Sequence, residues 1–291
     1  MQAKRKKLFM LFGLSVSSIA FLVFLYWFFI ASNHVETDSA YAAADIAQVT
    51  PAISGTVKTV KVVDTQQVQA GDELIALDDS DMQLSLKQAE ANLAHSAADL
   101  DRVQANYDRR KKLSASGYVS GEDLANAESS LKIAKATFDN ASALLEQAKI
   151  DLERTVLRAP IAGIVAKRDV QIGERVVAGA HLLSIVPVSQ IYVNANFKEV
   201  QLRNVKIGQP VEVHADLYGS RIVYHGRVVG VAGGTGSAFA IIPAQNASGN
   251  WIKVVQRLPV RIALDPDTLN KYPLQVGLSM HVDIKINGKT V

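Results

Sequence analysis

The side chains that could carry chemistry are scattered along this chain of 291 residues, and none of them completes a catalytic pattern. The sequence contains no Cys, so it offers neither a thiolate nucleophile nor a thiolate metal ligand. The histidines lack the spacing of a zinc motif such as HExxH, and a lone His at strand spacing is usually a half-exposed strand residue. The six histidines are His34, His95, His181, His214, His225 and His281. The sequence therefore predicts no catalytic residue and no metal site.

Two further motifs resemble parts of reactive sites. Residues 233–236 read Gly-Gly-Thr-Gly, but this run lacks the Gly-Lys-Ser/Thr end of a phosphate-binding loop and no predicted helix follows it. The carboxylates of Asp78 and Asp79 begin a predicted helix, where the helix dipole favours negative charge, and that position explains them. No Gly-x-Ser-x-Gly elbow is present either. The sequence thus predicts a non-enzymatic protein that uses no cofactor.

An uncharged run of 23 residues, 8–30, lies near the start of the chain and is rich in Phe, Leu, Val and Ile. As a helix at about 1.5 Å per residue it would reach roughly 34 Å, enough to cross the hydrocarbon core of a bilayer. The run is longer than the apolar part of a signal peptide, and no small-x-small cleavage site ends it. Because residues 4–7 are all basic, the positive-inside rule keeps residues 1–7 in the cytoplasm. We expect a single-pass transmembrane helix over 8–30 and an exported remainder.

The net charge of the chain reflects this cytoplasmic end. The formal net charge of the whole chain is +3. Without residues 4–7 the chain carries 27 basic and 28 acidic side chains, so the exported part is close to neutral. The basic balance is therefore a membrane-topology signal, and nothing in the composition indicates a nucleic-acid partner.

Two segments that lie 108 residues apart are copies of each other. Residues 53–57 read Ile-Ser-Gly-Thr-Val and residues 161–165 read Ile-Ala-Gly-Ile-Val, and the match continues without a gap. Each copy predicts short strands separated by Gly turns and is too small to bury a core alone. Two facing copies would form one small β-sandwich, so the chain between them has to leave the sandwich and return as a hairpin.

The inserted segment has the heptad pattern of a coiled coil. From Leu124 onward large apolar residues recur every seven positions, and a column of small residues, mostly alanines, follows three positions later. Upstream, a matching sevenfold column begins at Leu86. The small column lets two helices approach closely, and the short break at 114–117 makes the pair antiparallel. We predict helices over about 81–114 and 121–157.

Local signals mark where these two helices begin and end. Ser80 with Gln83, and Ser120 with Asp123, have the spacing of a capping box. At the far end, Pro160 stops the second helix, because the residue before a proline avoids helical backbone angles.

From about Ser189 the pattern returns to short strands separated by turn signals, which suits a small antiparallel barrel. The predicted fold class is α+β and multi-domain, with a transmembrane helix, a split β-sandwich, an antiparallel coiled-coil α-hairpin and an antiparallel β-barrel. The expected divisions are a cytoplasmic tail at 1–7, a transmembrane helix at 8–30, a barrel at 41–50 and 188–291, a sandwich at 51–79 and 158–187, and a hairpin at 80–157.

This order of elements resembles the periplasmic adaptors, the membrane fusion proteins of the HlyD type, from the anchor to the end of the chain. The sandwich halves are similar to those of lipoyl and biotinyl carrier domains, in which the modified Lys lies at the turn between the halves. Here residues 78–80 and the whole hairpin occupy that turn, so a swinging-arm carrier is not expected. Residues 234–239, 243–251 and 253–262 are similar to the EmrA-like branch, which acts in multidrug efflux. The resemblance implies a Gram-negative inner-membrane protein whose bulk is periplasmic.

The family's hairpin tip carries Arg, then Leu four residues on, then Ser seven residues after that. This chain has Arg109, Leu113 and Ser120 at those spacings. The resemblance implies that these residues engage the helical tip of an outer-membrane channel, with Leu in an intermolecular groove and hydrogen bonds from Arg and Ser around it. In the alternative interpretation Arg109 lies on a solvated helix face, Leu113 closes the coil and Ser120 only caps the second helix.

The resemblance also implies the partners. The adaptor would join an inner-membrane exporter, of the major-facilitator type, to an outer-membrane channel. Because a single hairpin cannot enclose a channel, we expect a ring of three or six copies. An ATP-driven exporter of type I secretion or ABC efflux is the alternative transporter, and a structural protein that tethers the envelope is the competing class. Energy would come from the transporter, since the sequence contains no nucleotide site.

Overall fold

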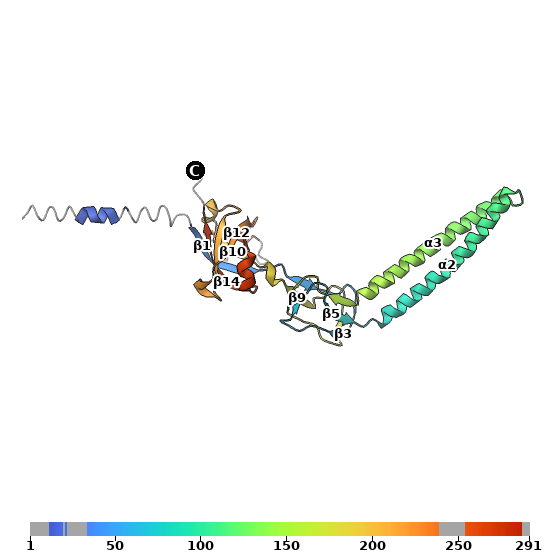
Figure 1. Cartoon of the computed structure of the whole chain (residues 1–291), viewed down its shortest axis with the longest axis horizontal. Helices are drawn as coiled ribbons and strands as arrows, with labels where there is room; N and C mark the ends of the chain where they lie inside the picture. The colour runs from blue at the N-terminus through green and yellow to red at the C-terminus, as the bar shows by residue number, and fades with distance from the viewer. Residues whose placement is uncertain (1–11, 20, 22–33, 239–253, 287–291) are drawn as a thin grey trace, which may run out of the picture. The chain divides into compact units, whose positions relative to one another are not determined.

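The computed structural model describes residues 12–19, 21, 34–238 and 254–286 (Figure 1). The chain divides into two compact units. One unit is Ile46–Ile185 and holds the sandwich and the hairpin. The other combines Met1–Asp45 with Val186–Val291 and holds the barrel.

The predicted transmembrane helix at 8–30 lies mostly outside the described residues. Of that segment, residues 12–19 and 21 are described and they are helical. Within the described ranges, no helix is both long enough and apolar enough to cross a membrane.

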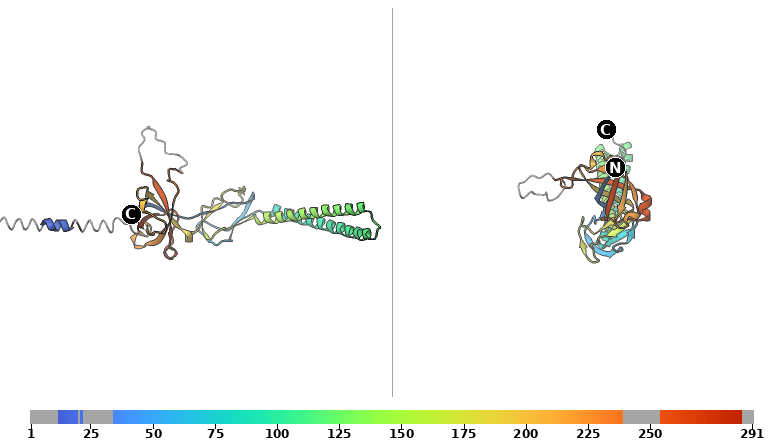
Figure 2. Two further views of the ribbon diagram at one scale, coloured as in Figure 1. Left: turned by 90° about the horizontal axis from the view of Figure 1, so that it is seen from above. Right: turned by 90° about the vertical axis from the view of Figure 1, so that its left-hand side faces the viewer.

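The barrel unit is a closed sheet of six strands, each antiparallel to its neighbours (Figure 2). Its alternating residues point inward around Phe197 and Tyr224, neither of which is exposed. The first strand begins at His34, so the barrel strand covers 34–43 rather than the 41–50 that the sequence pattern assigned to the barrel. In spatial order the strands are β1 (His34–Ala43), β10 (Tyr192–Lys198), β13 (Arg257–Leu264), β12 (Tyr224–Val231), β11 (Pro210–Ala215) and β14 (Ser279–Lys285).

Short helices complete the connections of this unit. The sequence does not mark them as helices, because each is only a turn or two long. They are η2 (Val188–Gln190), η3 (Leu202–Asn204), η4 (Gly219–Arg221) and α4 (Pro266–Lys271).

The sandwich consists of two four-stranded sheets that share strands from both sequence copies. One sheet runs β2 (Ala47–Val49), β9 (Leu183–Val186), β7 (Gly163–Ala166), β4 (Gln67–Val68); the other runs β6 (Val156–Arg158), β5 (Glu73–Leu77), β3 (Gly55–Val60), β8 (Arg175–Val176). Strand β3 of the first copy pairs with β8 of the second, and β4 pairs with β7. The two copies therefore face each other across one core, as the repeat predicts.

Matching backbone contacts show the internal symmetry of the sandwich. The amide of Gly71 donates to the carbonyl of Ala159 at 2.8 Å, and the amide of Gly179 donates to that of Pro51 at 2.9 Å. Both glycines have positive φ, 92° and 82°, which residues with a side chain rarely adopt. Each half thus uses its Ala-Gly pair to place an equivalent turn against the other half.

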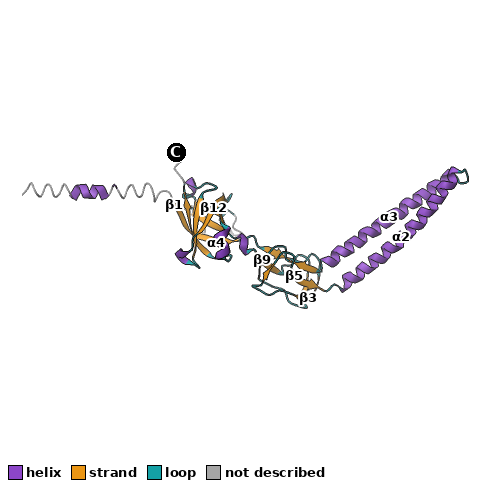
Figure 3. Ribbon diagram, viewed as in Figure 1, coloured by secondary structure: helices purple, strands orange, loops and turns teal. Residues whose placement is uncertain are grey.

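The hairpin consists of two long helices, α2 (Ser80–Ala115) and α3 (Gly121–Glu153), packed side by side (Figures 1 and 3). The small column is the buried one, and the larger apolar residues lie half-buried beside it. Buried positions of α2 are Ala89, Ser96 and Val103, and those of α3 are Ala127, Ala134, Ala141 and Ala148. The alanines let the two backbones approach closely, as the heptad pattern predicts.

Both helix boundaries nearest the sandwich differ from the sequence prediction. The N-cap of α2 is Asp79 rather than Ser80, because the carbonyl of Asp79 accepts the first helical hydrogen bond, from the amide of Gln83 at 2.9 Å. Helix α3 ends at Glu153 instead of 157, because residues 156–158 pair with β5 as the edge strand of the sandwich. Tertiary pairing therefore overrides the local helical pattern at this point.

Candidate functional site

The tip of the hairpin is a compact turn formed by residues 116–120. The amides of Ser116 and Tyr118 both donate to the carbonyl of Leu113, each at 3.1 Å. These bonds satisfy one of the free carbonyls at the end of α2. The backbone at the end of α2 is therefore fixed, which also fixes the position from which the Leu113 side chain extends.

An ion pair closes the coil next to this turn. Arg110 occupies the position seven residues after Val103, in the column that is buried elsewhere in the hairpin. Its guanidinium lies 3.7 Å from the carboxylate of Asp123 in the first turn of α3. Both side chains are partly exposed, so the pair contributes at most about 1 kcal/mol to stability. The coil therefore ends in a polar contact, and Leu113 is not needed to close it.

Leu113 and Arg109 lie on the solvent side of this closure. They are four residues apart in α2, so their side chains are neighbours on one helical face. Leu113 is 43% exposed. The side chain of Arg109 is exposed and has no hydrogen-bond or ion-pair partner among the residues that the structure describes. The tip thus presents the exposed apolar side chain of Leu113 beside the guanidinium of Arg109, which has no partner among the described residues.

Ser120 is the N-cap of α3. Its Oγ accepts a hydrogen bond from the amide of Asp123 at 3.1 Å and donates to the Asp123 carboxylate at 2.7 Å. The prediction that Ser120 caps the second helix is confirmed, although the Asp123 carboxylate bonds to the Ser120 hydroxyl rather than to its amide. The Ser120 hydroxyl therefore already donates a hydrogen bond within the hairpin, whereas the Arg109 guanidinium donates none to the described residues.

Sequence reasoning missed Tyr118, which lies in the turn and is 82% exposed. A tyrosine that sits among Ser and Gly residues between two helices is the signal that could have found it. Exposed aromatic residues are frequent anchors of protein interfaces. Tyr118 therefore joins Arg109 and Leu113 as a candidate contact residue of the tip.

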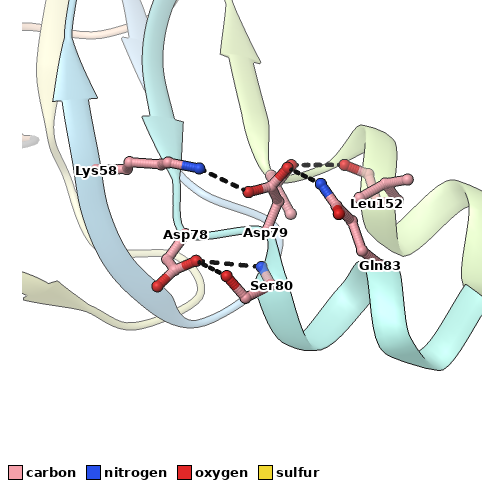
Figure 4. A network of polar contacts seen from close by, with 7 residues as sticks. Lys58, Asp78, Asp79, Ser80, Gln83 and Leu152 are labelled. Atoms are coloured by element: carbon pink, nitrogen blue, oxygen red, sulfur yellow. Dashed lines mark hydrogen bonds and ion pairs between the residues drawn. The ribbon is translucent and has the colours of Figure 1, made fainter.

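The opposite end of the hairpin is tied to the sandwich by a polar network (Figure 4). Nζ of Lys58 in β3 lies 3.0 Å from Oδ1 of Asp79, and the Gln83 side chain donates to Oδ2 of Asp79 at 2.6 Å. The hydrogen bond from Lys58 lowers the pKa of the Asp79 carboxyl, and the same bond raises the pKa of Lys58. Next to it, Asp78 accepts hydrogen bonds from the amide and the hydroxyl of Ser80, which lower the pKa of Asp78.

The end of α3 is attached to the same side of the sandwich. The buried hydroxyl of Thr155 donates to the carbonyl of Leu152 at 2.6 Å, and the Thr155 carbonyl accepts from the amide of Leu77 at 2.8 Å. Strand β5 therefore bonds to the residue that follows α3, and along the chain it leads into α2. The chain connects the hairpin to the sandwich at two points, before α2 and after α3, and hydrogen bonds fix both connections at the base of the hairpin.

Histidines of the barrel make pairwise contacts with carboxylates. His34 Nδ1 lies 2.7 Å from Asp283, and His281 Nδ1 lies 3.4 Å from Asp38. Within the described part of the chain, no three His, Asp or Glu side chains are grouped so that they could hold a metal ion.

Two family models match the chain. The model described as the RND MFP barrel-sandwich hybrid domain covers residues 45–189, and the AAEA-like beta-barrel domain covers residues 190–285. The chain is 44% identical to the fatty acid resistance protein FarA of Neisseria gonorrhoeae, over 86% of this chain and 75% of FarA. It is 36% identical to the multidrug export protein EmrA of Haemophilus influenzae, over 97% of this chain and 84% of EmrA.

The fold is also similar to that of a solved structure, the membrane fusion protein Spr0693 of Streptococcus pneumoniae R6. The TM-score is 0.65 at 16% identity, over 88% of this chain and 99% of Spr0693. A closed barrel, a two-copy sandwich and a hairpin inserted between the copies define an adaptor of the membrane fusion class. The chain belongs to the HlyD-type membrane fusion proteins, in their EmrA-like branch, and is a non-enzymatic adaptor.

Proposed function

We propose that this chain is the periplasmic adaptor of a tripartite efflux pump, which links an inner-membrane drug exporter to an outer-membrane channel. The observation that carries this proposal is the hairpin tip, where Leu113 is exposed beside the unpaired Arg109 although the coil is already closed by Arg110 and Asp123. An exposed aliphatic group with an adjacent free guanidinium suits insertion into an apolar groove bordered by acceptors.

The relatives support a role in export of amphipathic toxic compounds. FarA is named for fatty acid resistance, and EmrA is named a multidrug export protein. We propose an exporter of the major-facilitator type as the partner, with an ATP-driven exporter as the alternative. The transporter supplies the energy in either case, because the sequence has no nucleotide-binding motif.

The proposed placement in the envelope follows from the sequence. Residues 8–30 form the single inner-membrane span, residues 1–7 lie in the cytoplasm and the remainder lies in the periplasm of a Gram-negative bacterium. The proposed working divisions are the barrel, the lipoyl-like sandwich and the hairpin, whose helices cover 80–115 and 121–153.

We further propose that three or six copies assemble side by side into a ring, because one hairpin cannot surround a conduit. Native mass spectrometry of the detergent-solubilised protein together with its transporter measures the copy number. A trimer or hexamer is expected, and a monomer under these conditions would contradict the ring.

Co-purification tests the adaptor role against the competing role of an envelope tether. The full chain is cross-linked in native membranes, purified by an affinity tag, and its partners are identified by mass spectrometry. The adaptor role predicts both a polytopic transporter and an outer-membrane channel among the partners. Recovery of neither would favour the tether. A solubilised span of another single-pass protein with the same tag provides the control for non-specific capture.

A further inference from the structure

Each sheet of the sandwich has an open strand at both of its ends. Strands β2 and β6 end the two sheets at one edge, and β4 and β8 end them at the other. Residues 48–50 and 156–158, from the first of these edges, line a common groove with a volume of about 470 Å³. Because an edge strand is paired on one side only, a neighbouring chain can approach it from the other side. We call this hollow the edge groove.

The edge groove is mainly apolar and contains one acidic side chain without a partner. Its apolar lining consists of Val49, Ala52, Ile150, Val156, Leu157 and Pro160. Two basic residues of the lining are already paired, Arg154 with Asp151 at 3.2 Å and Arg158 with Glu73 at 2.9 Å. Glu153, at the end of α3, is exposed and has no hydrogen-bond or ion-pair partner among the described residues. The groove is therefore suited to aliphatic side chains that accompany a cation.

The opposite end of the sheet β6-β5-β3-β8 presents side chains of that kind. Ile172, just before β8, is 67% exposed, and Val177, just after it, is 61% exposed. Val176 between them is buried, so Arg175 and Val177 point outward, because side chains alternate along a strand. The exposed side chain of Arg175 has no partner among the residues that the structure describes. We call Ile172, Arg175 and Val177 the β8 set.

The internal repeat shows that the fold does not require these side chains. The equivalent positions of the first copy, 108 residues earlier, are occupied by Asp64, Gln67 and Gln69. Both copies nevertheless make the same turn. The amide of Gln66 donates to the carbonyl of Val63 at 3.2 Å, and the amide of Glu174 donates to that of Gln171 at 3.3 Å. Two aliphatic residues and a base at polar positions of the turn therefore indicate a contact that the second copy alone makes.

The edge groove and the β8 set are complementary and lie at opposite edges of one sandwich. The groove combines apolar lining with an unpaired acid, and the β8 set combines aliphatic side chains with an unpaired base. Opposite charges across an interface favour the correct partner and fix the register. A ring requires a head-to-tail interface, in which each copy uses two different surfaces. A partner of another kind would need only one of these surfaces, so their complementarity favours a second copy of this chain.

We propose that the β8 set of one copy docks into the edge groove of the next copy. Ile172 and Val177 cover the apolar lining, and Arg175 pairs with Glu153 of the neighbouring copy. The proposal rests on the ring of the proposed function and identifies the surfaces that join its copies. The contact repeats around the ring, and it holds the bases of neighbouring hairpins next to each other, because Glu153 ends α3.

Cysteine cross-linking tests this contact, because the sequence contains no other thiol. The full chain carries Gln48→Cys in the groove together with Ile172→Cys, and it is solubilised with its transporter and treated with a short bis-maleimide. Head-to-tail docking predicts a ladder of linked copies from this double variant and no dimer from either single variant. The control combines Gln48→Cys with Ile133→Cys and should give no ladder, since Ile133 is 68% exposed but lies on the hairpin.

Charge reversal in the double-cysteine chain tests the pair between Arg175 and Glu153. Either Glu153→Arg or Arg175→Glu places like charges together and should lower the cross-linked fraction by about tenfold. The two reversals combined should restore it. Glu146→Arg, at an exposed position of α3 outside the groove, should leave the ladder unchanged. A ladder that withstands both single reversals would overturn the assigned pairing.

Native mass spectrometry of the same samples separates failure of the contact from failure of the ring. A trimer or hexamer without the ladder overturns the docking of the β8 set and leaves the ring intact. A monomer without the ladder overturns both. Dimers from Ile172→Cys alone would show a symmetric contact and contradict the head-to-tail interface. A product that links position 172 to the transporter would assign the β8 set to that partner and overturn the proposal.

Discussion

Lys58 in β3 of the sandwich forms an ion pair with Asp79, the N-cap of α2, at 3.0 Å between Nζ and Oδ1. The two residues are 21 positions apart, and the pair links the sheet to the first turn of the hairpin. The Asp79 carboxylate also favours the positive end of the helix dipole. The Asp79 side chain therefore links β3 to the first turn of α2 through Lys58 and Gln83 (Figure 4).

This pair predicts a specific pH dependence of stability. The pKa of Asp79 is lowered from its ordinary value of 3.8, so its contribution is present above that value and is lost as the pH falls through the lowered pKa. The pKa of Lys58 is raised from 10.5, so its contribution is present below that value and is lost at higher pH. Asp79→Asn should lower the thermal unfolding midpoint by a constant amount between about pH 5 and pH 9.

Below the ordinary pKa of an aspartate the difference between Asp79→Asn and the unmodified chain should shrink. Hydrogen exchange of amides in the first turn of α2 reports the same loss locally. A difference in unfolding midpoint that persists undiminished in strong acid would contradict the role of the charged carboxylate. Lys58→Met, which keeps an aliphatic stem, separates loss of the charge from loss of packing.

The alanine column predicts intolerance to size at the seam of the hairpin. Ala141→Leu adds volume between α2 and α3 and should destabilise the hairpin by about 1–3 kcal/mol. The matched change Ala136→Leu lies on an exposed position of the same helix and should leave stability nearly unchanged. Chemical denaturation followed by circular dichroism compares them. Equal stability of the two variants would mean that the helices are not in close contact.

Tyr224 predicts an alkaline transition of the barrel. Its side chain is fully buried, its hydroxyl donates to the carbonyl of Tyr272 at 3.0 Å, and burial raises its pKa to about 12. A raised pKa contributes stability below the ordinary value of 10.0 that is lost as the pH rises through the folded-state value. Tyr224→Phe should cost about 1 kcal/mol at neutral pH and should weaken the alkaline loss of stability.

Tyr41, which is 48% exposed, provides the control for this change. Tyr41→Phe should leave the stability at neutral pH unchanged, and denaturant titration at each pH compares the two variants. If both variants had the same alkaline transition as the unmodified chain, Tyr224 would not be the group that titrates.

Ser120 predicts a separable effect on stability at the tip. Ser120→Ala removes the cap of α3 and should cost about 1 kcal/mol, whereas Ser120→Asp should retain most of the cap. The unfolding free energies of the two variants test this difference. Equal losses for Ala and Asp would indicate that the cap bond contributes little.

The repeat predicts the sandwich and the heptads predict the hairpin, because both signals can be read from short stretches of sequence. The sequence pattern does not predict where β1 begins. Its register shifts between Thr37 and Ala40, which interrupts the alternation of inward and outward residues. The end of α3 was misjudged because residues 156–158 fill the edge of a sheet whose other strands lie far away in the sequence. Long-range pairing decided both boundaries.

At the hairpin tip, too, the sequence predicts the local features but not the contact between the two helices. The spacing of Arg109, Leu113 and Ser120 was visible in the sequence, and the cap at Ser120 is confirmed. The pair between Arg110 and Asp123 depends on the register of one helix against the other, which no local pattern specifies. Because that pair closes the coil, Leu113 is not needed to close it.

The tip predicts loss of function without loss of stability. Leu113→Asp places a charge in the proposed apolar contact, and Arg109→Ala removes the free guanidinium. A charge desolvated in an interface costs several kcal/mol, so docking should fail. Because both side chains are exposed, the unfolding midpoint should stay nearly unchanged. Drug susceptibility of cells that express each variant at the level of the unmodified chain measures the effect, and full resistance in both would contradict docking by these residues.

Site-specific photo-cross-linking from the tip tests the central claim most directly. A benzophenone amino acid replaces Leu113 in one strain and Ile133, an exposed aliphatic residue away from the tip in α3, in another. The adaptor account predicts a cross-link from position 113 to an outer-membrane channel protein, its loss when Arg109→Ala is added, and no such product from position 133. Absence of any outer-membrane product from position 113, or equal products from both positions, would contradict the account.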